Sequence, residues 1–148
     1  DREFLTFVEG LVALRRAHPI FQRRRYFHGR NVRGSRLGDI DWLRGDGDEM
    51  TEADWNAPFA KSLGVFLNGQ ALEGVDERGE RRTDDSFMIL FNAHHEPIDF
   101  VLPADEFGAA WVPVIYTAAE AAVASEPLGA GAKVSVDARA VMVLRAAE

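Results

Sequence analysis

The chain has 148 residues, of which 47% are hydrophobic and 28% charged, the balance of a globular protein with one domain or one domain plus an appendage. It has no cysteine, which excludes disulfides, thiolate zinc sites and a cysteine nucleophile and fits a reducing cytoplasm. The net charge of −7 argues against nucleic acid or an anionic membrane as partner, and no stretch reaches the roughly 20 apolar residues that span a bilayer.

The charge is unevenly distributed along the chain. Residues 1–36 hold nine Lys or Arg against three acids, whereas residues 37–148 hold eight against twenty-one. A shift of this size indicates pieces of different origin with a boundary in the thirties. We therefore expect an N-terminal helix with a basic connection over 1–36, a linker over 37–60 and a C-terminal β domain over 61–148.

The first predicted element is an amphipathic helix over 3–17, which must end near Ala17 because Pro19 biases His18 away from helical angles. Its apolar stripe is broad, so we expect it to pack on something substantial. The stripe consists of Phe4, Phe7, Val8, Leu11, Val12 and Leu14. The basic connection that follows contains the run Arg23–Arg25, for which a solvated stretch or pairing with nearby acids is the expected role.

The segment over 37–60 predicts a short strand at Ile40–Leu43, a turn at Asp46-Gly47, and a short helix that starts at Thr51. Thr51 and Asp54 have the spacing of a capping box.

From residue 61 the pattern becomes β, with alternation over 63–67 and a fully apolar run over 87–91 that is typical of a central buried strand. The turn over 92–97 predicts a hairpin between that run and the alternating residues 98–102. Further strands are expected over 111–116, 134–136 and 141–144, with a loop over 118–132, and Pro113 favours an edge position or a bulge. Short strands without intervening helices indicate a mainly β fold, an antiparallel β-sandwich.

Aromatic residues are the first candidates for a binding site. Trp42 and Trp55 lie in the 37–60 segment and could stack on sugar rings, although packing is the commoner role of tryptophan, and Tyr116 belongs to the same hypothesis. Trp111 opens a strand and is expected in the core.

The titratable residues do not assemble a catalytic site. Asp84 and Asp85 precede a strand, where we expect them to accept hydrogen bonds from loop amides, and Asp39 and Asp41 could form a carboxylate pair but are expected to be solvated or paired with arginine. His94 and His95 lack the spacing of a zinc pair and are expected in a turn.

The acids Asp46, Asp48 and Glu49 fail the calcium-loop template, since Met50 stands at its fifth position and no glycine follows at the sixth. No phosphate-binding or dinucleotide motif is present. We predict no catalytic residue, metal or cofactor in this chain.

Three blocks of the chain resemble bacterial glycogen debranching enzymes, the isoamylase-like members of the α-amylase family of glycoside hydrolases. Residues 7–27, with Arg15-Arg16-Ala17-His18-Pro19 and Arg23-Arg24-Arg25-Tyr26-Phe27, resemble the last helix of their (β/α)8 barrel. Residues 39–55, from Asp39-Ile40-Asp41-Trp42-Leu43 to Asp54-Trp55, resemble the segment after that helix, with Gly45 where proline is expected. Residues 84–97, with Asn92-Ala93-His94-His95-Glu96-Pro97, and 139–145 resemble the C-terminal β domain.

The resemblance implies that the catalytic carboxylates, an aspartate nucleophile, a glutamate acid/base and a second aspartate, belong to barrel strands upstream of Asp1. We therefore expect a non-catalytic C-terminal segment of a cytoplasmic enzyme that cleaves α-1,6 branch linkages in glycogen, with a sandwich that stabilises the barrel. Its expected partners are that barrel and, through the parent enzyme, the glucan. Two alternatives remain open: an independent carbohydrate-binding module, and a domain that holds the parent enzyme as an oligomer.

Overall fold

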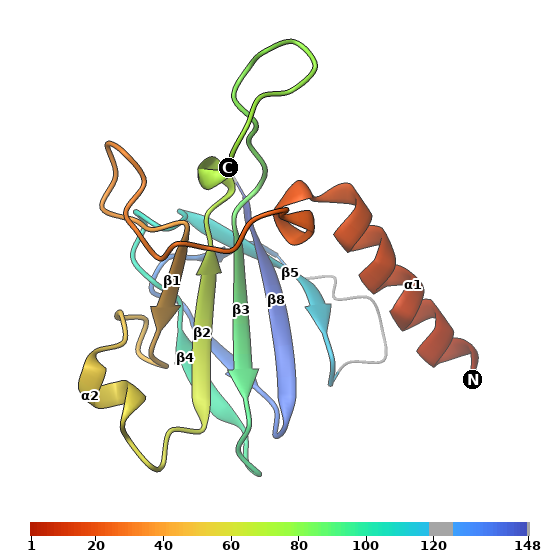
Figure 1. Cartoon of the computed structure of the whole chain (residues 1–148). Coiled ribbons are helices and arrows are strands. Elements are labelled where there is room, and N and C mark those ends of the chain that lie inside the picture. The colour runs from red at the N-terminus through yellow and green to blue at the C-terminus, as the bar shows by residue number, and fades with distance from the viewer. Residues whose placement is uncertain (119–125, 148) are drawn as a thin grey trace.

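The computed structural model describes residues 1–118 and 126–147, which form a mainly β structure (Figure 1). The helical elements are α1 (Arg2–Ala17), η1 (Pro19–Gln22), α2 (Glu52–Trp55) and η2 (Gly69–Ala71), of which η1 and η2 are 3-10 turns. The strands are β1 (Ile40–Leu43), β2 (Ser62–Leu67), β3 (Phe87–Asn92), β4 (Ile98–Val101), β5 (Ala110–Tyr116), β6 (Leu128–Gly129), β7 (Lys133–Val136) and β8 (Ala140–Ala147). The predicted loop over 118–132 lies partly outside the described residues, and its described part contains β6.

Six strands form one antiparallel sheet in the order β1-β2-β3-β8-β5-β6. β3 pairs with β2 on one side and with β8 on the other, which confirms the central strand predicted from the apolar run. The register of β5 against β8 shifts between Pro113 and Ile115, so the bulge that the proline favours is present. β6 pairs only with Ala110 and Trp111, so the missing N–H of Pro113 removes no hydrogen bond on that side.

The second sheet pairs β4 with β7, and the predicted hairpin between β3 and β4 is therefore wrong. After β3 the chain crosses to the other layer instead of turning back along the same sheet. The buried Asn92 holds this crossing, because its side-chain amide donates to the carbonyls of Glu96, Val136 and Asp137 at 2.9 Å, 3.1 Å and 3.0 Å. Alternation along β4 correctly predicts a strand, but it does not identify the partner.

The main core lies between the two sheets and confirms an antiparallel sandwich. Phe66, Met88 and Leu144 of the large sheet pack in one cluster with Phe100 and Val136 of the small one. Trp111 belongs to the same cluster and is 0% exposed, as its position at the start of a strand predicts. None of the helices among residues 1–118 and 126–147 combines the length and the apolar character needed to cross a bilayer.

The predicted N-terminal helix is present as α1. The Asp1 carboxylate caps it by accepting from the backbone N–H groups of Glu3 and Phe4, and it ends at Ala17 because His18 is extended before Pro19. No residue of α1 is buried, however, and Figure 1 shows the helix leading away from the sheet. The expectation that its stripe packs on something substantial is thus not met by the described residues: Phe4 is 64%, Leu11 38% and Val12 42% exposed.

Candidate functional site

The two tryptophans predicted to bind sugar lie side by side. Trp42 extends from β1 and Trp55 from the end of α2, and their ring centroids are 5.4 Å apart with the planes at 75°. The predicted capping box starts α2: the Thr51 hydroxyl accepts from the Asp54 N–H, and the Asp54 carboxylate accepts from the Thr51 N–H at 2.7 Å. Trp42 is 40% and Trp55 52% exposed, so the pair presents an aromatic surface of defined geometry.

A network of charged groups adjoins the tryptophan pair. Arg44 donates to Asp46 at 3.1 Å and 2.8 Å and to Asp48 at 3.3 Å, and its guanidinium lies 3.6 Å from Asp54. The hydrogen bond from Arg44 lowers the pKa of Asp46, and the Thr51 backbone N–H lowers the pKa of Asp54. The lowered pKa values favour the ionised forms of Asp46 and Asp54, and these carboxylates and Arg44 present hydrogen-bonding groups beside the aromatic surface.

Tyr116, the third aromatic residue of the sugar-binding hypothesis, is not part of this surface. It lies on β5, which β2, β3 and β8 separate from β1 in the large sheet. Its hydroxyl accepts from the backbone N–H of Asp137 at 2.9 Å, and burial raises its pKa. Tyr116 is therefore a packing residue that anchors the turn after β7.

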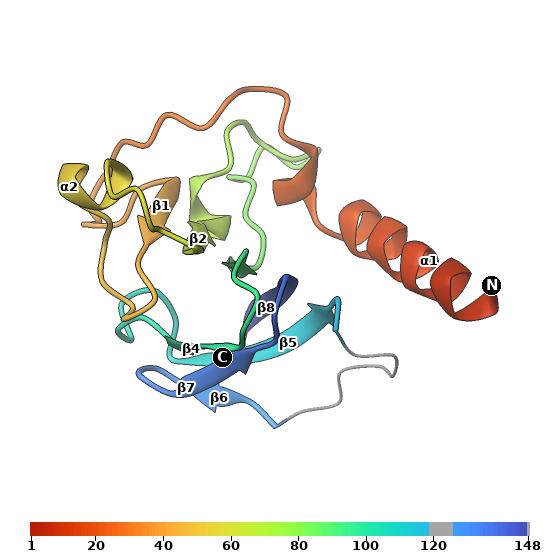
Figure 2. The same cartoon turned by 90° about the horizontal axis from the view of Figure 1, so that it is seen from below.

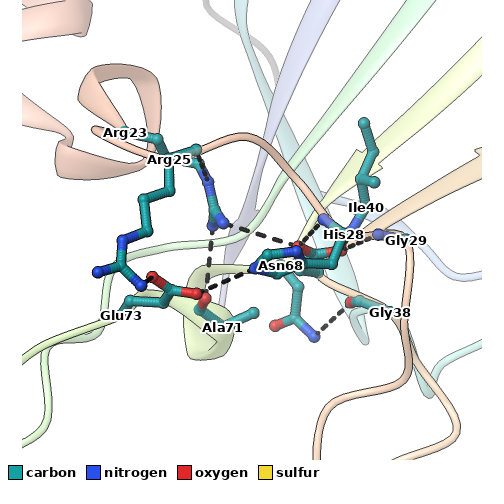
Figure 3. Close-up of polar contacts among 10 residues, drawn as sticks. Arg23, Arg25, His28, Gly29, Gly38, Ile40, Asn68, Ala71 and Glu73 are labelled. Atoms are coloured by element: carbon teal, nitrogen blue, oxygen red, sulfur yellow. Dashed lines mark hydrogen bonds and ion pairs between the residues drawn. The ribbon is translucent and has the colours of Figure 1, made fainter.

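Asp39 is a structural anchor whose partners include His28, Gly29 and Ile40, which Figure 3 shows close together. Its side chain is 7% exposed and accepts from the backbone N–H groups of His28, Gly29 and Ile40 at 2.7 Å, 2.8 Å and 2.9 Å. The Arg23 guanidinium lies 3.6 Å away, which confirms pairing with arginine. With its lone pairs engaged in this way, Asp39 holds the basic connection against the start of β1.

Asp41 does not join Asp39 in a shared site. Its carboxylate accepts instead from the Gly38 N–H at 2.9 Å, and it lines a cavity of about 500 Å³ together with Asp48, Glu49 and Glu106. Desolvation raises its pKa, with smaller contributions in the same direction from Glu49, Asp39 and Glu106.

Asp84 ties the end of α1 to the β domain. Its side chain is 8% exposed and accepts from the His18 ring at 2.8 Å, from the Ile20 N–H at 3.1 Å and from the Asp85 N–H at 2.7 Å. The amide contacts confirm the prediction for an acid that precedes a strand. The partner His18 is 66 residues away, and no local pattern points to it.

Two groups of side chains place possible metal ligands within 4.8 Å of one another: His94, His95 and Glu96, and His18, Asp84 and Asp85. In the first group the Nδ1 atom of His94 accepts from the Glu96 N–H at 3.1 Å, as expected for a turn. In the second group the His18 Nδ1 atom bonds directly to Asp84. Hydrogen bonds thus engage the His94 ring in the first group and the His18–Asp84 pair in the second.

Comparisons with known proteins give a family and several relatives. The model of the family "Isoamylase, C-terminal" matches residues 39–145. A "Glycogen operon protein GlgX homolog" of Mycobacterium tuberculosis is 40% identical over 153 residues, which cover 98% of this chain and 20% of that protein. A "Glycogen debranching enzyme" of Erwinia tasmaniensis is 27% identical over 109 residues, 74% of this chain and 13% of that protein.

A solved structure shows the same fold. The pullulanase type I of Bacillus subtilis, complexed with maltose, superposes with a TM-score of 0.55 at 15% identity, covering 99% of this chain and 16% of that one. The chain spans about a fifth of the length of its first curated relatives. Since the family's model covers more than two-thirds of it, this chain belongs to the isoamylase C-terminal domain family.

Proposed function

We propose that this chain is the non-catalytic C-terminal segment of a hydrolase that cleaves α-1,6 branch linkages in glycogen, and that it stabilises an upstream (β/α)8 barrel. The names of its relatives, a GlgX homologue and glycogen debranching enzymes, support the substrate. A cytoplasmic location fits this role, because the chain contains no cysteine.

The uncovered apolar surface is the observation that carries the structural role. Trp42, Val65, Ile89 and Val143 are cross-strand neighbours and so share one face of the large sheet. Figure 2 shows α1 on the side of this sheet that faces away from β4 and β7. The middle of this face is covered, since Val65 is buried against Ile20 and Phe87. Its exposed part, with Trp42 at 40% and Phe91 at 38%, and the stripe of α1 form the apolar surface that a catalytic barrel would cover.

We further propose that the chain divides by role into three parts. Residues 1–36 supply a barrel helix and its connection, 37–60 form the linker with the tryptophan pair, and 61–148 form the β domain. β1 lies in the linker but pairs with β2, so the linker is anchored to the sheet.

A debranching assay on glycogen limit dextrin tests the proposal. The purified chain should release no sugar, whereas the longer protein encoded with its upstream sequence should cleave the branches by a double displacement that uses two carboxylates about 5–5.5 Å apart. Clear turnover by the 148-residue chain would contradict the assignment.

A second candidate function, direct contact with α-glucan, is favoured by the adjacent, exposed rings of Trp42 and Trp55. Aromatic rings of this kind stack on the apolar faces of hexoses, and the Arg44 network supplies polar groups beside them. Maltooligosaccharide titration should change the tryptophan fluorescence of the chain and of the control Tyr26→Ala, whose ring is 94% exposed elsewhere, but not of Trp55→Ala. The absence of any response at millimolar sugar would count against this function.

A further inference from the structure

Four arginines gather around one cavity in a chain whose overall charge is negative. The cavity has a volume of about 590 Å³ and lies where the end of η1 meets the loop after η2. Its charged lining consists of Arg23, Arg24, Arg25, Arg82 and one acid, Glu73. Two segments about 50 residues apart in the sequence therefore bring their positive charges to the same place.

The first of these arginines is fixed in place. The Arg23 guanidinium donates to the Ala71 carbonyl at 3.4 Å, lies 3.6 Å from Asp39 and stacks on the Phe27 ring at 4.1 Å. Figure 3 shows Arg23 and Arg25 reaching from the same stretch of chain toward the Glu73 and Ala71 side. The Arg23 guanidinium is thus preorganised at the cavity.

The acid of the cavity, Glu73, is already paired with two basic side chains. Glu73 lies 3.4 Å from Arg25 and 3.1 Å from the Nε2 atom of His28, and the hydrogen bond from His28 lowers its pKa. Among residues 1–118 and 126–147, neither Arg24 nor Arg82 takes part in an ion pair. An excess of positive charge therefore remains at the cavity. The arginine side chains repel one another, and a bound anion would relieve this repulsion.

From this geometry we propose that the cavity binds a phosphate group, either free or as the monoester of a sugar, through Arg24 and Arg82. Guanidinium groups match the geometry of phosphate oxygens and bind them through paired, charge-assisted hydrogen bonds. The volume falls in the range of small-molecule sites and leaves room for a sugar beside the phosphate. A nucleic acid is disfavoured, because the net charge of −7 opposes binding of a long polyanion. The proposal is independent of the debranching role.

Calorimetric titration of the 148-residue chain in a low-salt chloride buffer tests the site, with the arginine Nε–H resonances as a second readout. The probes are inorganic phosphate, glucose 6-phosphate and glucose. We expect saturable binding of one or both phosphate compounds and no binding of glucose. The phosphate compound that binds more tightly shows whether the site is made for free phosphate or for a sugar phosphate. The variant Arg24→Gln/Arg82→Gln should bind about ten-fold more weakly or worse.

The matched control is Arg33→Gln/Arg36→Gln, which removes the same charge from exposed positions that do not line this cavity and should bind like the unchanged chain. Three results would overturn the site. They are no saturable signal up to about 20 mM phosphate compound, equal weakening in both double variants, or binding of a glutamate-rich peptide without binding of either phosphate compound.

Discussion

At the scale of single residues, buried carboxylates attach the irregular N-terminal part of the chain to the sheet. The Asp39 carboxylate accepts hydrogen bonds from three backbone N–H groups, and the Asp84 carboxylate accepts from the His18 ring and the Ile20 N–H. Each carboxylate satisfies donors that no strand or helix can serve. These acids therefore contribute to folding, and the cost of losing one can be measured.

We expect Asp84→Ala to lower the free energy of unfolding by about 3 kcal/mol, because it leaves the His18 ring and the Ile20 N–H without an acceptor in a buried site. Urea unfolding measures this change. The control is Asp85→Ala, whose side chain is 49% exposed and which should change stability by less than about 0.5 kcal/mol. Equal effects of the two substitutions would show that Asp84 does not hold the helix end.

Asp41 predicts that the stability of the chain depends on pH. Its pKa is raised in the folded state, so stability falls as the pH rises from the ordinary value of 3.8 through the folded pKa, and the loss is complete above it. Asp41→Asn should therefore raise the melting temperature at pH 7, since the amide oxygen still accepts from Gly38, and the gain should vanish as the pH approaches 3.8.

Asp46→Asn is the matched control for that experiment. The pKa of Asp46 is lowered by Arg44, so its contribution to stability is present above the ordinary value of 3.8 and is lost as the pH falls through the folded pKa. The substitution should lower the melting temperature slightly at pH 7. A pH-independent effect of Asp41→Asn, or a loss of the same sign as that of Asp46→Asn, would contradict the assignment.

At the scale of elements, the backbone of the turn η2 packs closely against the backbone of the loop before β3 at Gly69. A Cβ atom on Gly69 would lie 2.0 Å from the carbonyl oxygen of Asp84 and 2.5 Å from that of Asp85. The Gly69 carbonyl accepts from the Asp84 N–H at 2.9 Å, and its own N–H donates to the Ser86 hydroxyl at 3.0 Å. This close approach of two backbones requires glycine.

Gly69→Ala should cost about 3 kcal/mol of unfolding free energy, because backbone atoms rather than a flexible side chain must move. Thermal unfolding measures the loss. Gly129→Ala in β6 serves as the control, since nothing lies within 4 Å of its added Cβ atom. A melting temperature of Gly69→Ala equal to that of the control would rule out the close approach.

At the scale of the whole molecule, α1 is held at its C-terminal end and is otherwise uncovered by the described residues. Gln22 donates to the Arg15 carbonyl at 2.7 Å, and Leu14 packs against a smaller buried cluster on the outer face of the large sheet. That cluster consists of Ile20, Val65, Leu67, Leu72 and Phe87. In contrast, Phe4, Leu5, Leu11 and Val12 are exposed. A helix with such a stripe gains little from its own propensity and most from a covering surface.

Removal of residues 1–16 should therefore leave the β domain folded, with a loss of less than about 1 kcal/mol in unfolding free energy. Binding of a hydrophobic dye should fall at the same time, because the exposed stripe is gone. A variant that keeps the helix but carries Phe4→Glu and Leu11→Glu should reduce dye binding equally. Loss of cooperative unfolding in the shortened chain would mean that α1 is part of the core.

The tryptophan pair shows how far sequence reasoning reached at the candidate site. The capping box at Thr51 and Asp54 and the strand at Ile40–Leu43 are local patterns, and both are confirmed. That the rings of Trp42 and Trp55 meet was not predictable, because it depends on how the turn at Gly47 folds α2 back beside β1. The arginine cavity was missed for the same reason, since Arg82 arrives from a distant loop.

The sequence by itself determined the elements whose signals lie within a few residues: the length of α1, the short helix after Thr51, the central strand at 87–91 and the mainly β class. Only the tertiary structure decided that β4 leaves β3 to pair with β7, that His18 meets Asp84, and that the stripe of α1 remains uncovered by the described residues. Periodicity and capping report interactions along the chain, whereas the partner of a strand or an apolar face is chosen by packing in three dimensions.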